Sequence, residues 1–138
     1  MTCTLCHNQI NAKNAIQVPA GQVDLTGGVS SVDTSVVTSY EQVLFPHDEL
    51  TLNMGVLQDL TVTQPGPPPV MVPVQLTAPM AAGSAGGSTA FLRIFDGTFT
   101  DPVLDHTGFL TPGELRLISE WLDIGGQYYN DPFVAPAM

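Results

Sequence analysis

The clearest helical pattern in this 138-residue chain lies near its C-terminal end. Residues 111–114 match the pattern of a capping box, formed by Thr111 and Glu114. Thr111 is the N-cap, and Pro112 takes the first helical position. Two glycines at 125–126 are typical of a helix end. We therefore predict a helix of about twelve residues between these signals, a common length in globular proteins. Its apolar stripe consists of Leu115, Ile118, Trp121 and Leu122.

Two shorter helices are predicted earlier in the chain. Residues 39–45 carry Ser39 as a candidate N-cap and a proline just beyond the expected end. Residues 88–95 contain Phe91 and Phe95, which are one turn apart and share a helix face. Ordinary core packing and contact with a bound group explain this aromatic pair equally well.

Residues 62–87 form a region rich in proline and glycine. Its five prolines between positions 65 and 73 exclude a helix and disfavour a central strand. We predict a polyproline-like loop that leads into an extended segment at residues 70–72. The small residues at 78–87 would let the backbone approach a flat ligand closely. Residues 8–35 show little helical periodicity, so extended segments and turns are expected there.

The composition places the chain among globular proteins. Hydrophobic residues make up 43% and charged residues 12%, which excludes disorder of the whole chain. A length of 138 residues is enough for a core, so we predict a single domain over residues 1–138. The formal net charge of −10 argues against nucleic acid or an anionic membrane surface as a partner. No stretch is long and apolar enough to span a bilayer.

The strongest chemical signal is the motif Cys3-Thr4-Leu5-Cys6-His7, which contains the only two cysteines of the chain. CxxCH is the attachment signature of a c-type haem. Two thiols at this spacing can reach the two vinyl groups of one porphyrin and form thioethers, and the adjacent imidazole can bind the iron as the proximal ligand. The motif therefore predicts one covalent haem c.

Three other uses of the cysteine pair stay open. A thioredoxin-like dithiol would follow a strand in a βαβ unit, whereas only two residues precede Cys3. A zinc site would combine both cysteines with two of the three histidines, whose spacing matches no common ligand pattern. A disulfide between Cys3 and Cys6 would leave the adjacent histidine without a function. The three histidines are His7, His47 and His106.

The motif at the start and the helix signals at the end together resemble the class I cytochrome c family. The matching segments are residues 3–7, residues 110–115 and the pair Trp121-Leu122. Residues 117–130 are also similar to the ending of cytochrome c domains in bacterial exported proteins, which often carry several haems. The resemblance implies a mainly α fold, with helices around one haem, long Gly/Pro-rich loops and room for a small β element. It implies one-electron transfer rather than enzymatic catalysis.

Two features depart from the family. Class I cytochromes c have a helix before CxxCH that crosses the final helix, and only two residues precede Cys3 here. We therefore expect this helix to be missing or to come from sequence upstream. The middle of the chain is also longer and richer in proline and glycine than in a minimal cytochrome, so extra loops or short strands are expected there.

The family carries its second iron ligand in a loop shortly before the last helix. His106 lies five residues before Thr111, and Gly108 would let this loop turn close to the ring, so His106 is our preferred distal ligand. Met80 is the second choice because it follows a proline, as the loop methionine of many cytochromes does. The remaining candidates are His47, Met54 and Met71.

The type of distal ligand decides the function. Two strong axial ligands leave no open position on the iron and therefore favour electron transfer. An open position would instead permit ligand binding, so one alternative function is a haem-based sensing module. Another alternative is a structural haem-relay domain in a larger multihaem assembly. His47 lies between a proline and two acidic residues and is expected on the surface. The predicted cofactor-binding residues are Cys3, Cys6, His7, His106, Met80, Phe91, Phe95 and Trp121, with His7 and His106 as iron ligands.

Compartment and partners follow from the haem and the charge. Covalent haem attachment normally takes place outside the cytoplasmic membrane, so we expect an exported protein in the periplasm or at the cell surface. Thirteen Asp and Glu against three Lys and Arg favour redox partner proteins with a basic docking surface, although plain solubility explains the same charge. Association with other haem domains belongs to the alternative of a haem-relay domain in a multihaem assembly.

Overall fold

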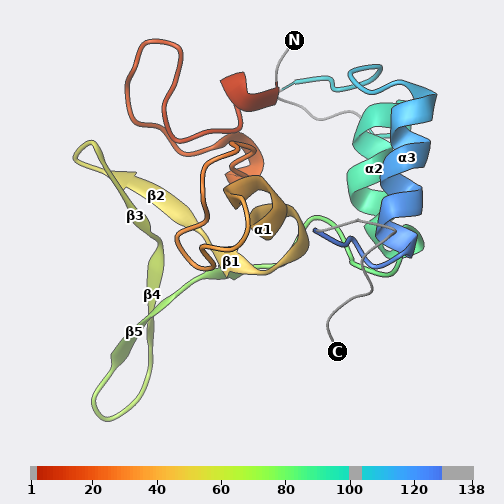
Figure 1. The fold of residues 1–138 in the computed structure, drawn as a ribbon. Coiled ribbons are helices and arrows are strands. Elements are labelled where there is room, and N and C mark those ends of the chain that lie inside the picture. The colour runs from red at the N-terminus through yellow and green to blue at the C-terminus, as the bar shows by residue number, and fades with distance from the viewer. Residues whose placement is uncertain (1–2, 100–103, 129–138) are drawn as a thin grey trace. The chain divides into compact units, whose positions relative to one another are not determined.

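The structure is a computed structural model that describes residues 3–99 and 104–128 (Figure 1). The chain divides into two compact units, unit 1 at Met1–Ala78 and unit 2 at Pro79–Met138. The CxxCH motif belongs to unit 1, and the predicted C-terminal helix belongs to unit 2. A single domain around one haem stays a prediction.

Unit 1 combines one short α-helix with three antiparallel ladders of two strands each in its described residues (Figure 1). The helix α1 spans Thr38–Leu44, and 3-10 turns lie at Cys3–Leu5 and Ala20–Gln22. The paired strands are β1 (His47–Asp48) with β6 (Gln75–Leu76), β2 (Leu50–Asn53) with β3 (Val56–Asp59), and β4 (Thr61–Gln64) with β5 (Val70–Pro73).

The β2–β3 hairpin follows from its two-residue turn. Met54 and Gly55 have φ angles of 50° and 81°, and a tight hairpin turn of this kind needs two positive values. Asn53 pairs with Val56 directly beside the turn. The turn therefore sets the register of the whole ladder.

The proline-rich segment forms the loop of the β4–β5 hairpin. Residues 65–69 connect Gln64 with Val70, which are partners in the ladder. The predicted extended segment at residues 70–72 is confirmed as part of β5. Because this ladder has only two strands, Pro73 is tolerated in it.

The predicted helix at residues 39–45 is confirmed as α1, but its cap differs. Val37 takes the N-cap position without a side-chain hydrogen bond, so Ser39 lies inside the helix. The helix buries Val43 and Leu44. Unit 1 also buries polar side chains, namely Asp24, Ser30, Glu41 and His47.

Unit 2 contains the 3-10 turn Gly86–Ser88 and the helices α2 (Thr89–Asp96) and α3 (Pro112–Asp123), which lie side by side (Figure 1). Both predicted helices are confirmed. The capping box is present: the Glu114 N–H donates to Thr111 Oγ1 at 3.3 Å, and the Thr111 N–H donates to Glu114 Oε2 at 2.7 Å.

The small-residue loop before α2 packs on the C-terminal end of α3. The Gly83 N–H donates to the Leu122 carbonyl at 2.7 Å, and the Ala85 N–H donates to Asp123 Oδ1 at 2.8 Å. The first of these bonds adds a second acceptor contact to the Leu122 carbonyl, which also accepts the Gly125 N–H at 2.9 Å. Leu122 is fully buried and Met80 is nearly so, and both belong to the core of unit 2.

The prediction of a mainly α fold is wrong. Six strands lie between residues 47 and 76, beside three α-helices in the described part of the chain, so the protein is a mixed α/β protein. The physical reason lies in the strand-forming valine, leucine and threonine residues of this stretch and in the tight turn at residues 54–55. These local signals outweigh what the resemblance implies for the middle of the chain.

Candidate functional site

The CxxCH motif folds into a tight turn of its own. The His7 N–H and the Cys6 N–H both donate to the Cys3 carbonyl, at 3.0 and 3.3 Å. Side chains three residues apart on a 3-10 turn lie nearly above one another. Cys3 and Cys6 are both exposed free thiols, so the two sulfur atoms are accessible from solvent.

The imidazole of His7 is oriented by a backbone carbonyl. Its Nδ1 lies 3.2 Å from the oxygen of Val23. A carbonyl oxygen can only accept, so the proton is assigned to Nδ1, and the neutral ring then carries its lone pair on Nε2. This tautomer is the one that can bind a metal through Nε2, with the second nitrogen held by a carbonyl.

The loop at residues 19–25 forms the wall that holds this imidazole. The Ala20 N–H donates to the Cys6 carbonyl at 3.0 Å, and the Leu25 N–H donates to the His7 carbonyl at 2.9 Å. Gly21, with φ of 59°, is close enough that an added Cβ would meet His7 Cε1 at 4.0 Å. Extended segments and turns were predicted for this region, but no signal in the sequence indicated that the loop contacts His7.

The predicted distal ligand lies in an aromatic cluster of unit 2. The His106 ring is 5.9 Å from the Phe95 ring and 5.3 Å from the Phe109 ring, with edge-on geometry. Phe91 stacks at a tilt on Phe95 at 5.2 Å, so the predicted shared face of this pair is confirmed. The structure thus brings three of the predicted site residues together, namely Phe91, Phe95 and His106.

Backbone hydrogen bonds hold the loop that carries His106. The Gly108 N–H donates to the Phe95 carbonyl at 3.2 Å, and the Phe109 N–H donates to the His106 carbonyl at 3.0 Å. Gly108 has φ of 78°, which a residue with a side chain rarely adopts. Next to the histidine, the hydroxyl and the N–H of Thr107 lower the pKa of Asp105 below its usual range.

Met80 and Trp121 complete the predicted set in unit 2. Met80 is 7% exposed, and its side chain fills the core. Trp121 is half-buried, and its Nε1–H donates to the Gln127 carbonyl at 3.0 Å. It lines a mostly apolar depression along α3 together with Leu117 and Ile124. The other three predicted residues, Cys3, Cys6 and His7, lie in unit 1.

The remaining ligand candidates are accounted for differently. His47 is 9% exposed, so the expectation of a surface position is wrong. Its Nε2 lies 3.0 Å from the Gln22 carbonyl, and this pairing of a ring nitrogen with a backbone acceptor is the reason for its burial. Met54 is 99% exposed at a hairpin turn, and Met71 is exposed on β5.

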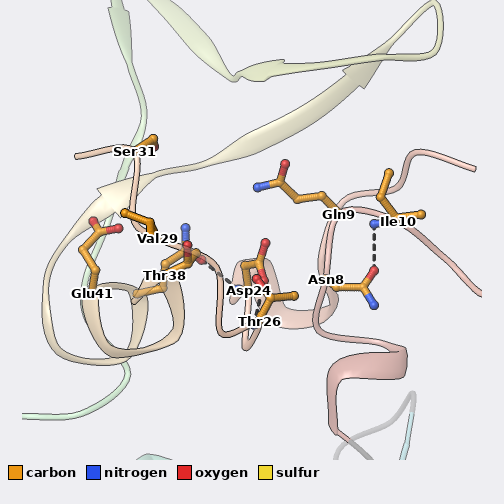
Figure 2. A pocket seen from close by; sticks show the side chains of 10 residues that line it. Asn8, Gln9, Ile10, Asp24, Thr26, Val29, Ser31, Thr38 and Glu41 are labelled. Carbon is orange, nitrogen blue, oxygen red and sulfur yellow. Dashed lines mark hydrogen bonds between the residues drawn. The ribbon is translucent and has the colours of Figure 1, made fainter. Parts of the chain in front are cut away.

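A polar depression of about 530 Å³ lies beside the motif in unit 1 (Figure 2). Two carboxylates from different segments, Asp24 and Glu41, line it in Figure 2. Both are engaged: Asp24 Oδ1 accepts the Thr26 N–H at 2.9 Å, and Glu41 Oε2 accepts the Ser30 hydroxyl at 3.2 Å. These hydrogen bonds show that the acidic groups help to build unit 1. No pattern in the sequence pointed to this depression.

Comparisons with known proteins add nothing to this site. No protein-family model, no curated protein and no solved structure matches the chain. Within residues 3–99 and 104–128, no three His, Cys, Asp or Glu side chains are grouped so that they could hold a metal ion. The same residues include no helix long and apolar enough to cross a membrane. The resemblance to class I cytochromes c therefore rests on the sequence motifs.

Proposed function

We propose that this protein carries one covalent c-type haem and transfers single electrons. The observation that carries the proposal is the hydrogen bond from His7 Nδ1 to the Val23 carbonyl, on a turn that exposes two thiols. It supports the proposal because histidines that bind a metal through one nitrogen usually donate the other N–H to a carbonyl, carboxylate or water. The residues of the motif therefore fit a haem.

Cys3 and Cys6 would hold the porphyrin. Each thiol adds its S–H across one vinyl C=C bond, so one C–S bond and one C–H bond form, no atom leaves, and no external oxidant is required. The exposure of both thiols is compatible with this reaction. Large apolar side chains near the motif are also exposed, and an attached porphyrin would remove apolar surface from water. These side chains are Leu5, Ile10 and Ile16.

The second iron ligand in this proposal is His106. The bound haem would supply an iron that changes between the ferric and ferrous states by one electron. His7 would bind the iron through Nε2, and His106 would supply the second imidazole. Two imidazoles leave no coordination position for a substrate, which favours electron transfer over catalysis. The aromatic rings of Phe95 and Phe109 restrict the orientation of His106, which suits a ligand.

The same proposal includes an exported compartment and a redox partner. Covalent haem attachment normally takes place outside the cytoplasmic membrane, so the periplasm or the cell surface is the expected location. A net charge of −10 favours a partner with a basic docking surface. The association rate should then fall as the ionic strength rises.

Expression with a haem-attachment system, followed by pyridine haemochrome spectroscopy, tests the attachment. We expect a c-type spectrum and haem that survives acid-acetone extraction. The double variant Cys3→Ser/Cys6→Ser should lose all covalent haem, whereas the control Thr4→Ala in the same turn should keep it. A colourless wild-type protein would contradict the proposal, and zinc in metal analysis would favour a zinc site instead.

Electron paramagnetic resonance and near-infrared spectra of the oxidised protein test the distal ligand. We expect the signature of two histidines, lost in His106→Ala and kept in Met80→Ala. Loss in Met80→Ala alone would assign the methionine. Prompt binding of carbon monoxide by the reduced wild-type protein at neutral pH would favour the alternative function, a ligand-sensing module.

A further inference from the structure

Gln22 adopts an unusual backbone conformation directly before the residue that orients His7. Its φ is 64°, and it follows Gly21 with φ of 59°. A residue with a side chain is disfavoured in this left-handed region, and such residues persist only where the surroundings hold them. The next carbonyl along the chain is that of Val23, which accepts the hydrogen bond from His7 Nδ1.

Three hydrogen bonds from one distant segment hold Gln22 in this conformation. The Gln22 Nε2 group donates to the Leu50 carbonyl at 3.1 Å, and the Leu50 N–H donates to Gln22 Oε1 at 2.9 Å. The third bond joins His47 Nε2 to the Gln22 carbonyl at 3.0 Å. Because that carbonyl can only accept, the His47 ring is the donor. We call Gln22, His47 and Leu50 the Gln22 clamp.

The His47 ring is built into the unit rather than placed on its surface. The side chain is 9% exposed, and its second nitrogen, Nδ1, lies 3.4 Å from the Phe45 carbonyl. The Nε2 contact is the shorter of the two, so the proton is assigned to Nε2, and this buried donor restricts where the Gln22 carbonyl can lie. The clamp therefore connects β1 and β2 to the loop that carries Val23.

We infer that Gln22 and His47 are positioning residues for the proximal iron ligand. The clamp sets the peptide between Gln22 and Val23, the Val23 carbonyl then sets the tautomer and the orientation of His7, and His7 Nε2 is the atom that would meet the iron. This inference rests on the proposed function. Gln22 and His47 would act on the iron through the orientation of His7 and not as ligands themselves.

The direction of the effect follows from the hydrogen bond to His7. An N–H that donates to a carbonyl makes the other ring nitrogen a stronger electron donor, which favours the ferric iron. Loss of the clamp should weaken this bond and move the reduction potential to a more positive value. A substitution cannot remove the Val23 carbonyl, because it is a backbone group. The hydrogen bond from His7 to this carbonyl is therefore changed through the side chains of the clamp.

Redox titration of the full-length holoprotein tests the inference. His47→Phe and Gln22→Gly should each raise the reduction potential, and His47→Gln, which keeps an N–H donor near the position of Nε2, should stay close to the wild-type value. Gln22→Gly suits the left-handed conformation, so it removes the side-chain bonds without straining the loop. Gln58→Ala, an exposed position on β3, is the matched control. Unchanged potentials in both clamp variants would overturn the inference.

A second measurement does not require the haem. Nitrogen-15 NMR of the His7 ring, in the full chain before haem attachment, distinguishes the Nδ1–H from the Nε2–H tautomer. We expect the Nδ1–H form in the wild type and in Gln58→Ala, and a shift toward Nε2–H in His47→Phe and Gln22→Gly. The same tautomer ratio in all four proteins would overturn the positioning role, even if haem attachment succeeds. Failure of haem attachment alone would overturn the proposed function and leave this test standing.

Discussion

The CxxCH turn of unit 1 and the N-terminal cap of α3 in unit 2 are positioned by interactions of different range. In unit 1 the bonds that set the motif join residues far apart in sequence, 16 positions for His7 with Val23, and 25 and 28 positions for Gln22 with its partners. In unit 2 the capping box spans three positions and the Trp121 bond spans six, although the bond from Ala85 to Asp123 in the same unit spans 38. Local bonds form with little loss of chain entropy, whereas long-range bonds require the whole loop arrangement.

The units also differ in what they bury. Among the described residues each unit buries two large apolar side chains, but unit 1 buries four polar or charged side chains and unit 2 buries one, that of Ser88. Apolar burial tolerates small shifts, while a buried polar group needs its partner at hydrogen-bond distance. Unit 1 is therefore expected to respond to the loss of single hydrogen bonds, and unit 2 to the loss of apolar volume.

The largest expected effect is a core truncation in unit 2. Leu122→Ala should lower the free energy of unfolding by about 2–5 kcal/mol, because it leaves a cavity around a fully buried side chain. Denaturant unfolding followed by fluorescence measures this effect, and Trp121, the only tryptophan, reports on unit 2. Leu117→Ala on the same helix, where the side chain is 66% exposed, should change little. Equal effects of both variants would contradict the proposed core.

A buried hydroxyl in unit 1 gives the next effect. Ser30 Oγ accepts from the N–H groups of Val32 and Asp33 and donates to Glu41. Ser30→Ala should cost about 1–3 kcal/mol, because the buried Glu41 carboxylate loses a hydrogen-bond donor and two backbone N–H groups lose their acceptor. Denaturant unfolding followed by far-ultraviolet circular dichroism measures it. Ser31→Ala, at the exposed neighbouring position, is the control. An unchanged free energy of unfolding in Ser30→Ala would contradict the contrast between the units.

The cap of α3 gives a smaller effect that depends on pH. Thr111→Ala should cost about 1 kcal/mol, and Thr111→Ser should restore most of it, since serine also caps helices. In the folded protein the N–H and the hydroxyl of Thr111 lower the pKa of Glu114. A carboxyl group with a lowered pKa adds stability at pH values above its pKa in the unfolded chain, about 4.3 for glutamate. This stability is lost as the pH falls through the pKa of the folded state.

Thermal unfolding of the wild type and of Glu114→Gln measures the pH dependence. The measurements run from about pH 3 to about pH 7, a range that includes the glutamate pKa. The two proteins should differ most near neutral pH and converge in acid. A constant difference across the range would show that the carboxylate charge contributes nothing to the cap.

The smallest effect is expected at the surface pair of α3. Arg116 Nε and Glu120 Oε1 are 2.7 Å apart, but both side chains are largely exposed. Exposed ion pairs four residues apart on a helix contribute little to stability because water screens them. Arg116→Ala should leave the thermal unfolding temperature unchanged in about 0.5 M salt, because salt at this concentration screens surface charges strongly. A clear loss of stability there would show that surface charge supports unit 2.

The sequence predictions were accurate where the signals are local and inaccurate where the structure depends on residues far apart in the sequence. The start and cap of α3 were predictable because every signal lies within four consecutive residues. Of the hairpins at residues 50–73 only the extended segment at 70–72 was predicted, although the Met54-Gly55 turn and the β-branched residues around it carried a local signal. The burial of His47 was not predictable, because its partner Gln22 lies 25 positions away.

The sequence by itself determined the CxxCH motif, the helices and the excess of negative charge, since each depends on residue type and short spacing. Only the tertiary structure decided that Val23 accepts the His7 proton, that Gln22 takes a left-handed conformation, and that His47 is buried beside it. The physical reason is the same in each case. Such bonds exist only after the chain has closed loops of sixteen or more residues, and no local preference specifies which carbonyl will lie at the end of them.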